Sequence, residues 1–170
     1  MKKLLFLAAA FVSGYAALAQ QKADEVIKLN ADTYNFGKIK QGVPAVTYFT
    51  VTNVSDKPVV IENAWAGCGC TTPEVSKAPI PPHGTTKVKV GYNAAAGGIF
   101  TKDVSLKLAG VQDIKVIKIT GEVLDANSYD AYTKTDEFKK AEKERLDREA
   151  KEAKAAKKAA KKEKKAVSSK

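Results

Sequence analysis

Apolar and polar residues alternate with a period of two from about residue 29 to residue 124. The alternating stretches are 45–53 (AVTYFTVTN), 58–64 (PVVIENA), 86–93 (TKVKVGYN), 102–110 (KDVSLKLAG) and 114–123 (IKVIKITGEV). Such alternation is typical of strands with one buried face, and an earlier strand is expected near residues 29–39. Residues that favour turns separate these stretches. The pattern predicts an all-β domain over residues 29–124, an antiparallel immunoglobulin-like β-sandwich of about seven strands.

The same alternation predicts which side chains fill the interior of the sandwich. Those expected to be buried are Phe49, Val51, Ile61, Val88, Val90, Val104, Leu106 and Ile119. The aromatic residues Tyr48, Tyr92 and Phe100 lie in strand stretches, and we expect them in the core as well.

The composition changes abruptly after Leu124, where Ala, Lys and Glu replace the β-branched residues. We expect a linker over residues 125–134 and a charged C-terminal α-helical tail over residues 135–170, helical or partly disordered, with Thr135 as its N-cap. Phe138 and Leu146 are nearly its only large apolar residues. The tail therefore lacks a continuous apolar stripe for packing and is predicted to be a solvated helix.

The first residues have the pattern of a secretory signal peptide. Two lysines precede an apolar run, and the small residues Ala17-Leu18-Ala19 follow it, which places cleavage after Ala19. Residues 1–19 are thus predicted to be the signal peptide and residues 20–28 a flexible N-terminal segment. No later apolar run reaches the roughly 20 residues of a spanning helix, so no transmembrane segment is expected after cleavage. The predicted location is the periplasm or the extracellular space.

Positive charge is concentrated at the end of the chain. The formal net charge is +10, and residues 150–170 carry nine lysines against two glutamates, a net of +7. A lysine tail attracts polyanions, so contact with an anionic surface is one interpretation and a solvated spacer is the other. The lysines assigned to such contacts are Lys157, Lys158, Lys161, Lys162, Lys164 and Lys165. Specific nucleic-acid binding is disfavoured by the export signal and by the absence of interleaved aromatic residues.

The two cysteines of the chain, Cys68 and Cys70, are separated by a single glycine. Four interpretations stay open: a local structural disulfide, a redox-active pair, a soft-metal site for Cu(I) or Zn(II), and an intermolecular bridge. A bond within so short a loop needs a tight bend, for which Gly67 and Gly69 are expected to supply positive-φ conformations. Such a bond would be easily reduced and would stabilise the fold little.

The sequence offers few residues for any other catalytic or metal site. A closed zinc site needs four ligands, whereas the chain offers two thiols, one histidine (His83) and scattered carboxylates. His83 lies in a PPHG turn and is expected to face solvent. Linear Cu(I) binding by Cys68 and Cys70 is the one metal alternative that survives. Without a nucleophile elbow or a phosphate-binding loop, we expect no catalytic residues, no cofactor and no enzymatic activity.

Trp65 is the only tryptophan and precedes the glycine-rich cysteine loop. We expect it to pack against the sulfurs as a core plug, and the alternative is an exposed platform for a ligand. Loops at the ends of a sandwich commonly carry recognition. A carbohydrate, a peptide and a neighbouring protein are all compatible with the sequence, and in the cell envelope these would be an envelope protein or a polysaccharide.

The order of these motifs resembles a known family. YNFGKIKQG, then YFTVTNVSDKPVVIENAWAGCGCTTPEV, then IPPHGTTKVKVGYNAAAGGIFTKDVSLKL and IKITGEV are similar to the bacterial family named domain of unknown function 1573, over about residues 32–124. The resemblance implies a small immunoglobulin-like sandwich, related to domains of sperm-protein and cilia-associated scaffolds, in secreted proteins of bacteria such as the Bacteroidetes. It implies no catalytic residues, because the family has no established activity.

Together these features predict a secreted, non-enzymatic binding or scaffold module of the bacterial cell envelope, with a basic tail that contacts anionic surfaces. The alternative is a thiol redox or copper(I)-binding protein that uses Cys68 and Cys70.

Overall fold

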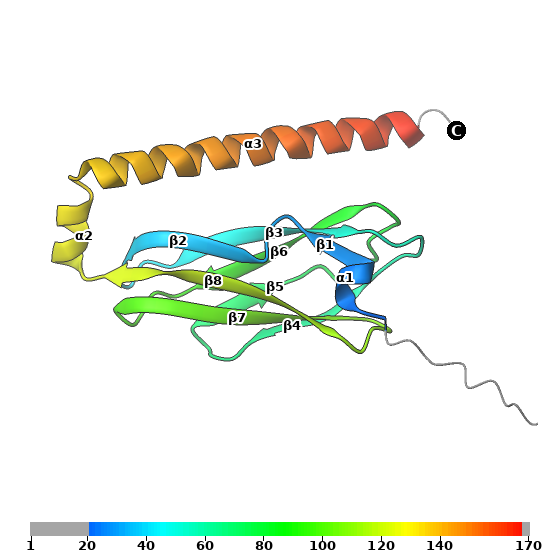
Figure 1. Cartoon of the computed structure of the whole chain (residues 1–170), viewed down its shortest axis with the longest axis horizontal. Coiled ribbons are helices and arrows are strands. Elements are labelled where there is room, and N and C mark those ends of the chain that lie inside the picture. The colour runs from blue at the N-terminus through cyan, green and yellow to red at the C-terminus, as the bar shows by residue number, and fades with distance from the viewer. Residues whose placement is uncertain (1–20, 168–170) are drawn as a thin grey trace, which may run out of the picture.

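Two β-sheets stack face to face, and two helices follow them in the chain (Figure 1). The structure is a computed structural model that describes residues 21–167, so the predicted signal peptide lies outside the described residues. The first sheet has the order β1 (Ile27–Leu29), β3 (Ala45–Asn53), β6 (Thr85–Tyr92), β5 (Thr71–Glu74). The second has the order β2 (Thr33–Lys40), β8 (Ile114–Leu124), β7 (Gly98–Leu108), β4 (Ile61–Ala66).

The described residues form eight strands rather than about seven, and one pair is parallel rather than antiparallel. The single strand expected near residues 29–39 is divided at residues 30–32, where the chain crosses from the first sheet to the second. Two hydrogen bonds fix this crossing: Thr50 N–H donates to Asn30 Oδ1 (2.8 Å), and Lys118 N–H donates to the carbonyl of Asp32 (2.8 Å). The crossing delivers β2 parallel to β8, and the remaining strand pairs are antiparallel.

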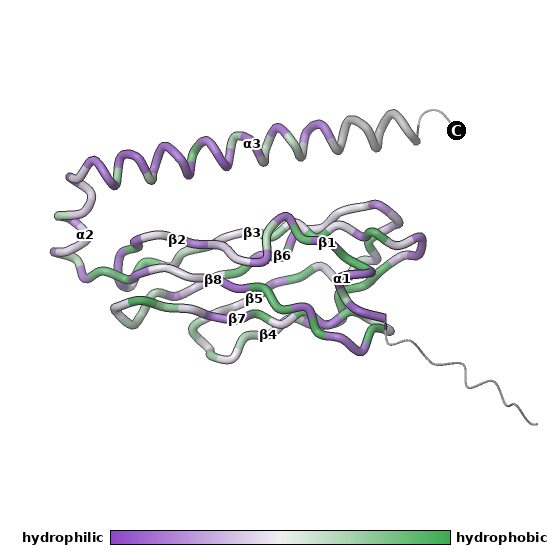
Figure 2. The backbone as a smooth tube through the Cα atoms, in the orientation of Figure 1, coloured by the Kyte–Doolittle hydropathy of each residue, from purple (hydrophilic) through white to green (hydrophobic). Residues whose placement is uncertain are grey.

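The sandwich core follows the predicted alternation. All eight side chains expected in the interior are buried, none more than 1% exposed. Tyr92 and Phe100 are also buried, with their rings stacked 4.1 Å apart between centroids. Figure 2 shows hydrophobic and hydrophilic residues alternating along the strands.

The prediction that Tyr48 lies in the core is wrong. Thr47, Phe49 and Val51 point inward from β3, so Tyr48 between them points to solvent and is 50% exposed. Its ring lies beneath the Lys87 ammonium, 5.6 Å from the centroid. This is a cation–π contact on the outer face of the first sheet.

The sandwich begins before residue 29, in the segment expected to be flexible. Residues 23–26 form a short helix, α1 (Ala23–Val26), which runs directly into β1. Ala23, Val26 and Ile27 are buried, and Ala23 N–H donates to Asp113 Oδ2 (2.9 Å). The burial of these apolar side chains ties the segment to the core, contrary to the expectation of flexibility.

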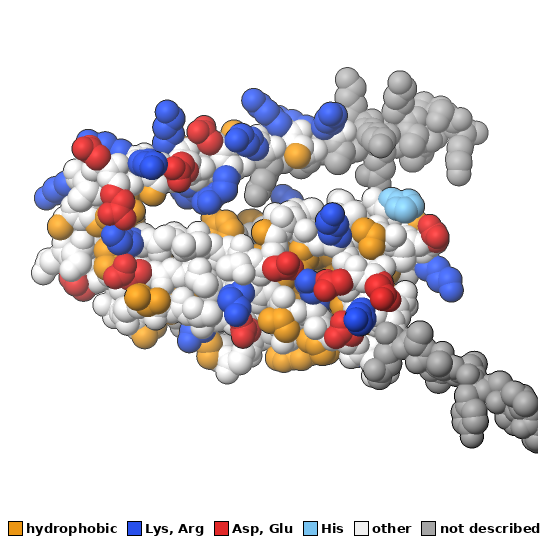
Figure 3. All heavy atoms as spheres, in the orientation of Figure 1, with side chains coloured by type: hydrophobic (Ala, Val, Ile, Leu, Met, Phe, Trp, Pro, Cys, Tyr) orange, Lys and Arg blue, Asp and Glu red, His pale blue; other side chains and the backbone are white. Residues whose placement is uncertain are grey.

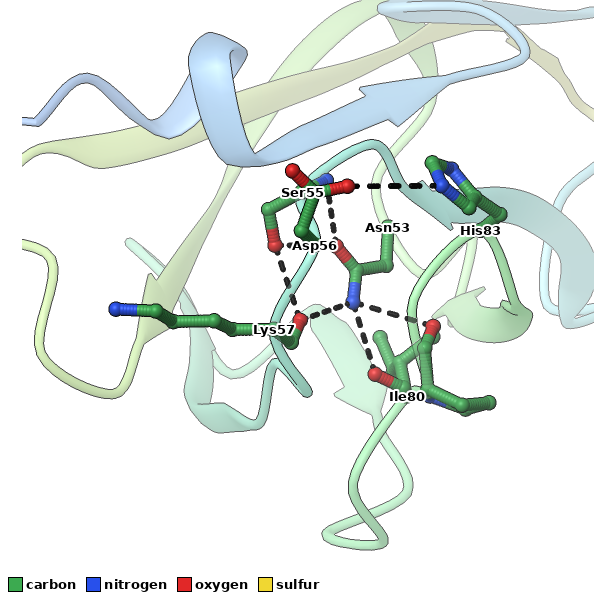
Figure 4. Close-up of polar contacts among 7 residues, drawn as sticks. Asn53, Ser55, Asp56, Lys57, Ile80 and His83 are labelled. Carbon is green, nitrogen blue, oxygen red and sulfur yellow. Dashed lines mark hydrogen bonds and ion pairs between the residues drawn. The ribbon is translucent and has the colours of Figure 1, made fainter.

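A buried amide organises the connection between β3 and β4 (Figure 4). Asn53 is fully buried, and its side-chain N–H groups donate to the carbonyls of Lys57 (2.7 Å), Ile80 (2.9 Å) and Pro81 (3.1 Å). Its side-chain oxygen accepts from the backbone N–H and the hydroxyl of Ser55. Because every polar atom of the amide has a partner, the residue can be buried at little cost.

His83 lies beside this cluster and faces solvent, as expected, with 74% of its side chain exposed. Its Nε2 is 3.8 Å from Asp56 Oδ1 (Figure 4).

The predicted linker contains a helix, α2 (Ala126–Tyr132). Asp125 caps it: Oδ1 accepts from the backbone N–H groups of Asn127 (2.9 Å) and Ser128 (3.1 Å). The side-chain and backbone hydrogen bonds from Ser128 lower the pKa of this carboxyl. α2 turns the chain so that the next helix, α3 (Asp136–Val167), runs back along the sandwich past β2 (Figure 1).

Thr135 caps α3 as predicted, because its hydroxyl accepts from the Phe138 N–H at 3.2 Å. The expectation of a wholly solvated helix is wrong for its first turns: Lys38 of β2 pairs with Glu137 at 2.9 Å, and the Arg148 guanidinium lies 5.6 Å from the Tyr34 ring centroid. Aromatic and charged side chains thus join α3 to β2, although the helix has no continuous apolar stripe. Of the described helices, none is both long and apolar enough to cross a bilayer.

Candidate functional site

The cysteine loop, residues 67–70, joins β4 of one sheet to β5 of the other. Cys68 and Cys70 are bonded, with 1.97 Å between the sulfurs and 5.2 Å between their Cα atoms. Two backbone hydrogen bonds hold the loop: Thr71 N–H donates to the Cys68 carbonyl (3.3 Å), and Asn93 N–H donates to the Cys70 carbonyl (3.0 Å). In this state both sulfurs are used by the bond, so the pair offers no thiolate to a metal ion.

The bend in this loop does not use left-handed glycine, contrary to prediction. Gly67 and Gly69 are absent from the residues with positive φ in the described part of the chain. A Cβ added to either glycine would meet nothing within 4 Å. The turn that Thr71 N–H closes on Cys68 therefore supplies the bend with ordinary backbone conformations.

Thr71 connects the disulfide to the interior. It is only 4% exposed, and its hydroxyl lies 3.8 Å from the Cys68 sulfur and 3.7 Å from the Cys70 sulfur. Cys70 also packs against the hydrophobic core. Thr71 and Cys70 thus anchor the loop to the core, while Gly67 and Gly69 stay exposed.

Trp65 is not a core plug. It points outward from β4 and is 41% exposed, because Ala64 and Ala66 on either side of it take the inward positions that pack against the core. Its cross-strand neighbour is Ser105 of β7, whose next neighbour is Val116 of β8, 44% exposed. We call this row of Trp65, Ser105 and Val116 the Trp65 face; it presents apolar surface beside the cysteine loop.

The lysines assigned to an anionic surface lie on the far part of α3. Lys157 and Lys158 are exposed. Lys161, Lys162, Lys164 and Lys165 belong to the same helix, and their side chains lie outside the described set. Figure 3 shows blue Lys and Arg side chains along the described part of α3.

A groove that the sequence did not predict lies between β2, α2 and the first half of α3. Its volume is about 310 Å³. The residues that define it as the aromatic–arginine groove are Tyr34, Phe36, Tyr129, Tyr132, Phe138, Arg145 and Arg148. One feature of the sequence could have indicated this groove. Of the 29 basic residues only two are arginines, Arg145 and Arg148, and they lie three positions apart in the segment that follows the aromatic residues of β2 and α2.

Ion pairs and hydrogen bonds connect several side chains that line this groove. The hydrogen bond from Arg145 lowers the pKa of the Glu142 carboxyl, and the same bond raises the pKa of Arg145. The hydrogen bond to Glu137 raises the pKa of Lys38, and burial raises the pKa of Tyr132. Within residues 21–167, no group of three or more His, Cys, Asp or Glu side chains could hold a metal ion.

The chain matches one protein family over most of its two sheets. The family described as "Protein of unknown function (DUF1573)" matches residues 27–123, which span both sheets from β1 to β8. The chain belongs to this family. The DUF1573 domain therefore includes the disulfide loop and the Trp65 face, while α2 and α3 follow it. No curated protein matches the sequence.

Solved structures resemble the DUF1573 domain in fold. A protein of unknown function from Porphyromonas gingivalis W83 is 20% identical, with a TM-score of 0.52 over 64% of this chain and 51% of that one. The VesB protease of Vibrio cholerae is 16% identical, with a TM-score of 0.50 over 59% of this chain and 33% of that one. The chain thus spans about half the length of the Porphyromonas gingivalis protein and about one third of the length of VesB.

The ASH/PapD-like domain 7 of human CEP192 is 10% identical, with a TM-score of 0.48 over 60% of this chain and 87% of that domain. At 20% and 16% identity, the comparisons with the Porphyromonas gingivalis protein and VesB concern the fold alone, a mostly antiparallel β-sandwich.

Proposed function

We propose that this DUF1573 protein is a secreted, non-enzymatic binding module of the bacterial cell envelope, held at an anionic surface by the lysine-rich end of α3. In this proposal the sandwich is immunoglobulin-like, and its exposed surfaces receive an envelope protein or polysaccharide. The signal-peptide pattern of residues 1–19 supports export. The Cys68–Cys70 bond is of the kind that persists in an oxidising compartment.

The observation that carries the proposal is the segregation of charge along one continuous helix. Residues 136–149 have six acidic and five basic residues, and this nearly neutral part lies along β2. Residues 150–170 have a net charge of +7, and the described side chains Lys151, Lys154, Lys157 and Lys158 are exposed. One end of α3 is thus attached to the domain, and the other presents cations to a surface.

Binding to lipid vesicles tests the surface contact. The mature chain, residues 20–170, is sedimented with vesicles of phosphatidylcholine and phosphatidylglycerol, and with vesicles of phosphatidylcholine alone. Each lysine near an anionic surface contributes about 1 kcal/mol, so replacing six lysines by glutamine should weaken binding at least about a hundredfold. The replaced residues are Lys157, Lys158, Lys161, Lys162, Lys164 and Lys165.

A matched control removes the same charge elsewhere. It replaces by glutamine six exposed lysines outside the segment: Lys28, Lys57, Lys77, Lys87, Lys134 and Lys140. The proposal expects this control to bind nearly as tightly as the unmodified chain. If both variants lose binding equally, net charge rather than the end of α3 is responsible, and the surface-anchor proposal fails.

A second candidate function, thiol redox exchange, is favoured by one observation: the Cys68–Cys70 bond lies in a loop with exposed glycines on both sides of Cys68. In such a reaction a partner dithiol gives two electrons and two protons to the bond and becomes a disulfide itself. Equilibration in glutathione buffers measures the potential of the pair. A potential below about −300 mV would mark a structural bond and exclude this candidate.

A further inference from the structure

The aromatic–arginine groove has the composition of a ligand site. It lies where β2 meets the α2–α3 turn, and its 310 Å³ place it at the lower end of the size range of small-molecule pockets. Three separate elements contribute to it, so its shape depends on the docking of α3. Figure 3 shows hydrophobic side chains beneath α3 where the helix passes the sandwich.

Aromatic rings form two of its walls. Tyr34 and Phe36 of β2 meet edge to face with centroids 5.0 Å apart, and Tyr132 and Phe138 do the same at 5.4 Å. In an edge-to-face pair the ring that presents its edge keeps its own faces uncovered by its partner. Tyr34, Phe36, Tyr129 and Phe138 are only half-buried, so solvent reaches part of each side chain. Cations already lie over one face of three rings: Arg148 over Tyr34 (5.6 Å to the centroid), Lys40 over Tyr129 (5.9 Å) and Lys38 over Tyr132 (4.8 Å).

The two arginines occupy different situations in the groove. Arg145 is held by Glu142 through Nε (3.1 Å) and a terminal nitrogen (2.6 Å), and by Glu149 through the other terminal nitrogen (2.6 Å). It is therefore a fixed part of the wall. Arg148 is exposed, and its guanidinium lies 5.6 Å from the Tyr34 ring centroid. A guanidinium in such a cation–π contact can bind a planar anion with two parallel hydrogen bonds.

Arginine is used at two of the 29 basic positions of the chain, and both line this groove. Lysine would give the same charge there without the planar fork and without stacking. Around the rings, the Glu144 carboxylate and the side-chain N–H groups of Asn35 add polar groups that can bond to hydroxyls. The lining thus matches a ligand with an apolar ring face, several hydroxyls and a carboxylate.

We propose that the aromatic–arginine groove binds a hexuronic acid residue of an acidic polysaccharide, with the carboxylate on Arg148 and the sugar ring against Tyr34 and its aromatic neighbours. The inference builds on the proposed binding role in the envelope. It uses other residues than the lysine-rich end of α3.

Titration with defined oligosaccharides tests the proposal on the mature chain, residues 20–170. The probes are tetragalacturonate, a hyaluronan tetrasaccharide and, as a neutral match, fully methyl-esterified tetragalacturonate, with inorganic phosphate as a simple anion. Calorimetry gives the affinity, and amide chemical shifts locate the site. We expect shifts confined to β2, α2 and the first half of α3, and affinity at least about tenfold weaker for the neutral probe, since charge-assisted bonds are lost.

Variants separate the roles of the side chains. Arg148→Gln and Arg148→Lys should each weaken uronate binding at least about tenfold, the second because lysine lacks the bidentate fork. Tyr34→Leu keeps an apolar side chain and removes the ring face, and it should weaken the binding of both charged and neutral sugars. Lys140→Gln removes one exposed charge from the same helix outside the groove and should leave affinity unchanged.

Several results would overturn the proposal: no binding of either uronate, equal binding of the methyl ester, shifts by phosphate that match those by the sugars, or full affinity in Arg148→Gln. The test also stays distinct from that of the surface anchor. The variant with six lysines replaced should keep uronate binding, and Arg148→Gln should keep binding to anionic vesicles. Loss of both activities in either variant would contradict the separation of the two sites.

Discussion

Replacing Asn53 by alanine is the substitution whose effect the structure predicts most directly. The amide is fully buried and satisfies carbonyls from two loops as well as the N–H and hydroxyl of Ser55. Its two N–H groups share three acceptors and its oxygen accepts two hydrogen bonds, five in all, and a typical hydrogen bond is worth about 1 kcal/mol net. Water reaches part of this cluster, so we expect Asn53→Ala to lower the free energy of unfolding by about 3 kcal/mol.

Urea denaturation followed by far-UV circular dichroism measures this loss. For a domain of this size it corresponds to a decrease in melting temperature of about 12 °C, at about 4 °C per kcal/mol. Asn63→Ala is the matched control, because Asn63 is an exposed strand residue whose side chain bonds only the adjacent backbone N–H. A loss below about 1 kcal/mol in Asn53→Ala would refute the role of the amide, because one ordinary hydrogen bond accounts for that much.

Three further predictions concern packing, the disulfide and pH. Gly121→Ala places a Cβ 2.8 Å from the Phe100 ring and should lower the free energy of unfolding by about 1–3 kcal/mol. Gly91→Ala is the control and should cost far less, because the nearest atom to its added Cβ is 3.7 Å away. Equal losses of the two variants in thermal denaturation would be inconsistent with the close packing at Gly121. Replacing Cys68 and Cys70 by serine should lower the free energy of unfolding by at most about 1.5 kcal/mol, because the loop that the bond closes is so short. A much larger loss in the same assay would show that the bond supports the core. The hydrogen bond from Arg145 lowers the pKa of Glu142 from its ordinary value of 4.5, so its small contribution is complete above pH 4.5 and is lost as the pH falls through the lowered value. The protection factors of the α3 amides, which are exchange rates corrected for the intrinsic rate at each pH, should fall in that acid range before those of the sandwich do. A fall in the α3 protection factors on going from pH 5 to pH 7 would contradict the assignment.

The sandwich could be predicted because each strand repeats one rule, alternation between core and solvent. That rule placed all eight inward side chains correctly, from Phe49 to Ile119. It could not place the division between β1 and β2, because the chain crosses between sheets at residues 30–32 through hydrogen bonds with Thr50 and Lys118, which are distant in sequence. The parallel pairing of β2 with β8 follows from the same long-range contacts.

The candidate sites were harder to predict, because their residues are brought together by elements far apart in the chain. The motif of Cys68 and Cys70 was visible, but its bonding state was not. Trp65 is expected from its place beside the cysteine loop to pack against the sulfurs, whereas its position between two inward alanines directs it to solvent. The groove depends on α2 turning the chain back toward β2, which no local pattern of the tail indicates.

Export and surface retention are the centre of this account, and one measurement tests both. The full chain, residues 1–170, is expressed in a bacterium with an outer membrane, the cells are fractionated, and the intact mass of the recovered protein is determined without reductant. The account predicts a chain that begins at Gln20, is two hydrogens lighter than its reduced form, and is released from the envelope fraction by salt. A chain recovered from the cytosol with residues 1–19 intact and two free thiols would contradict it.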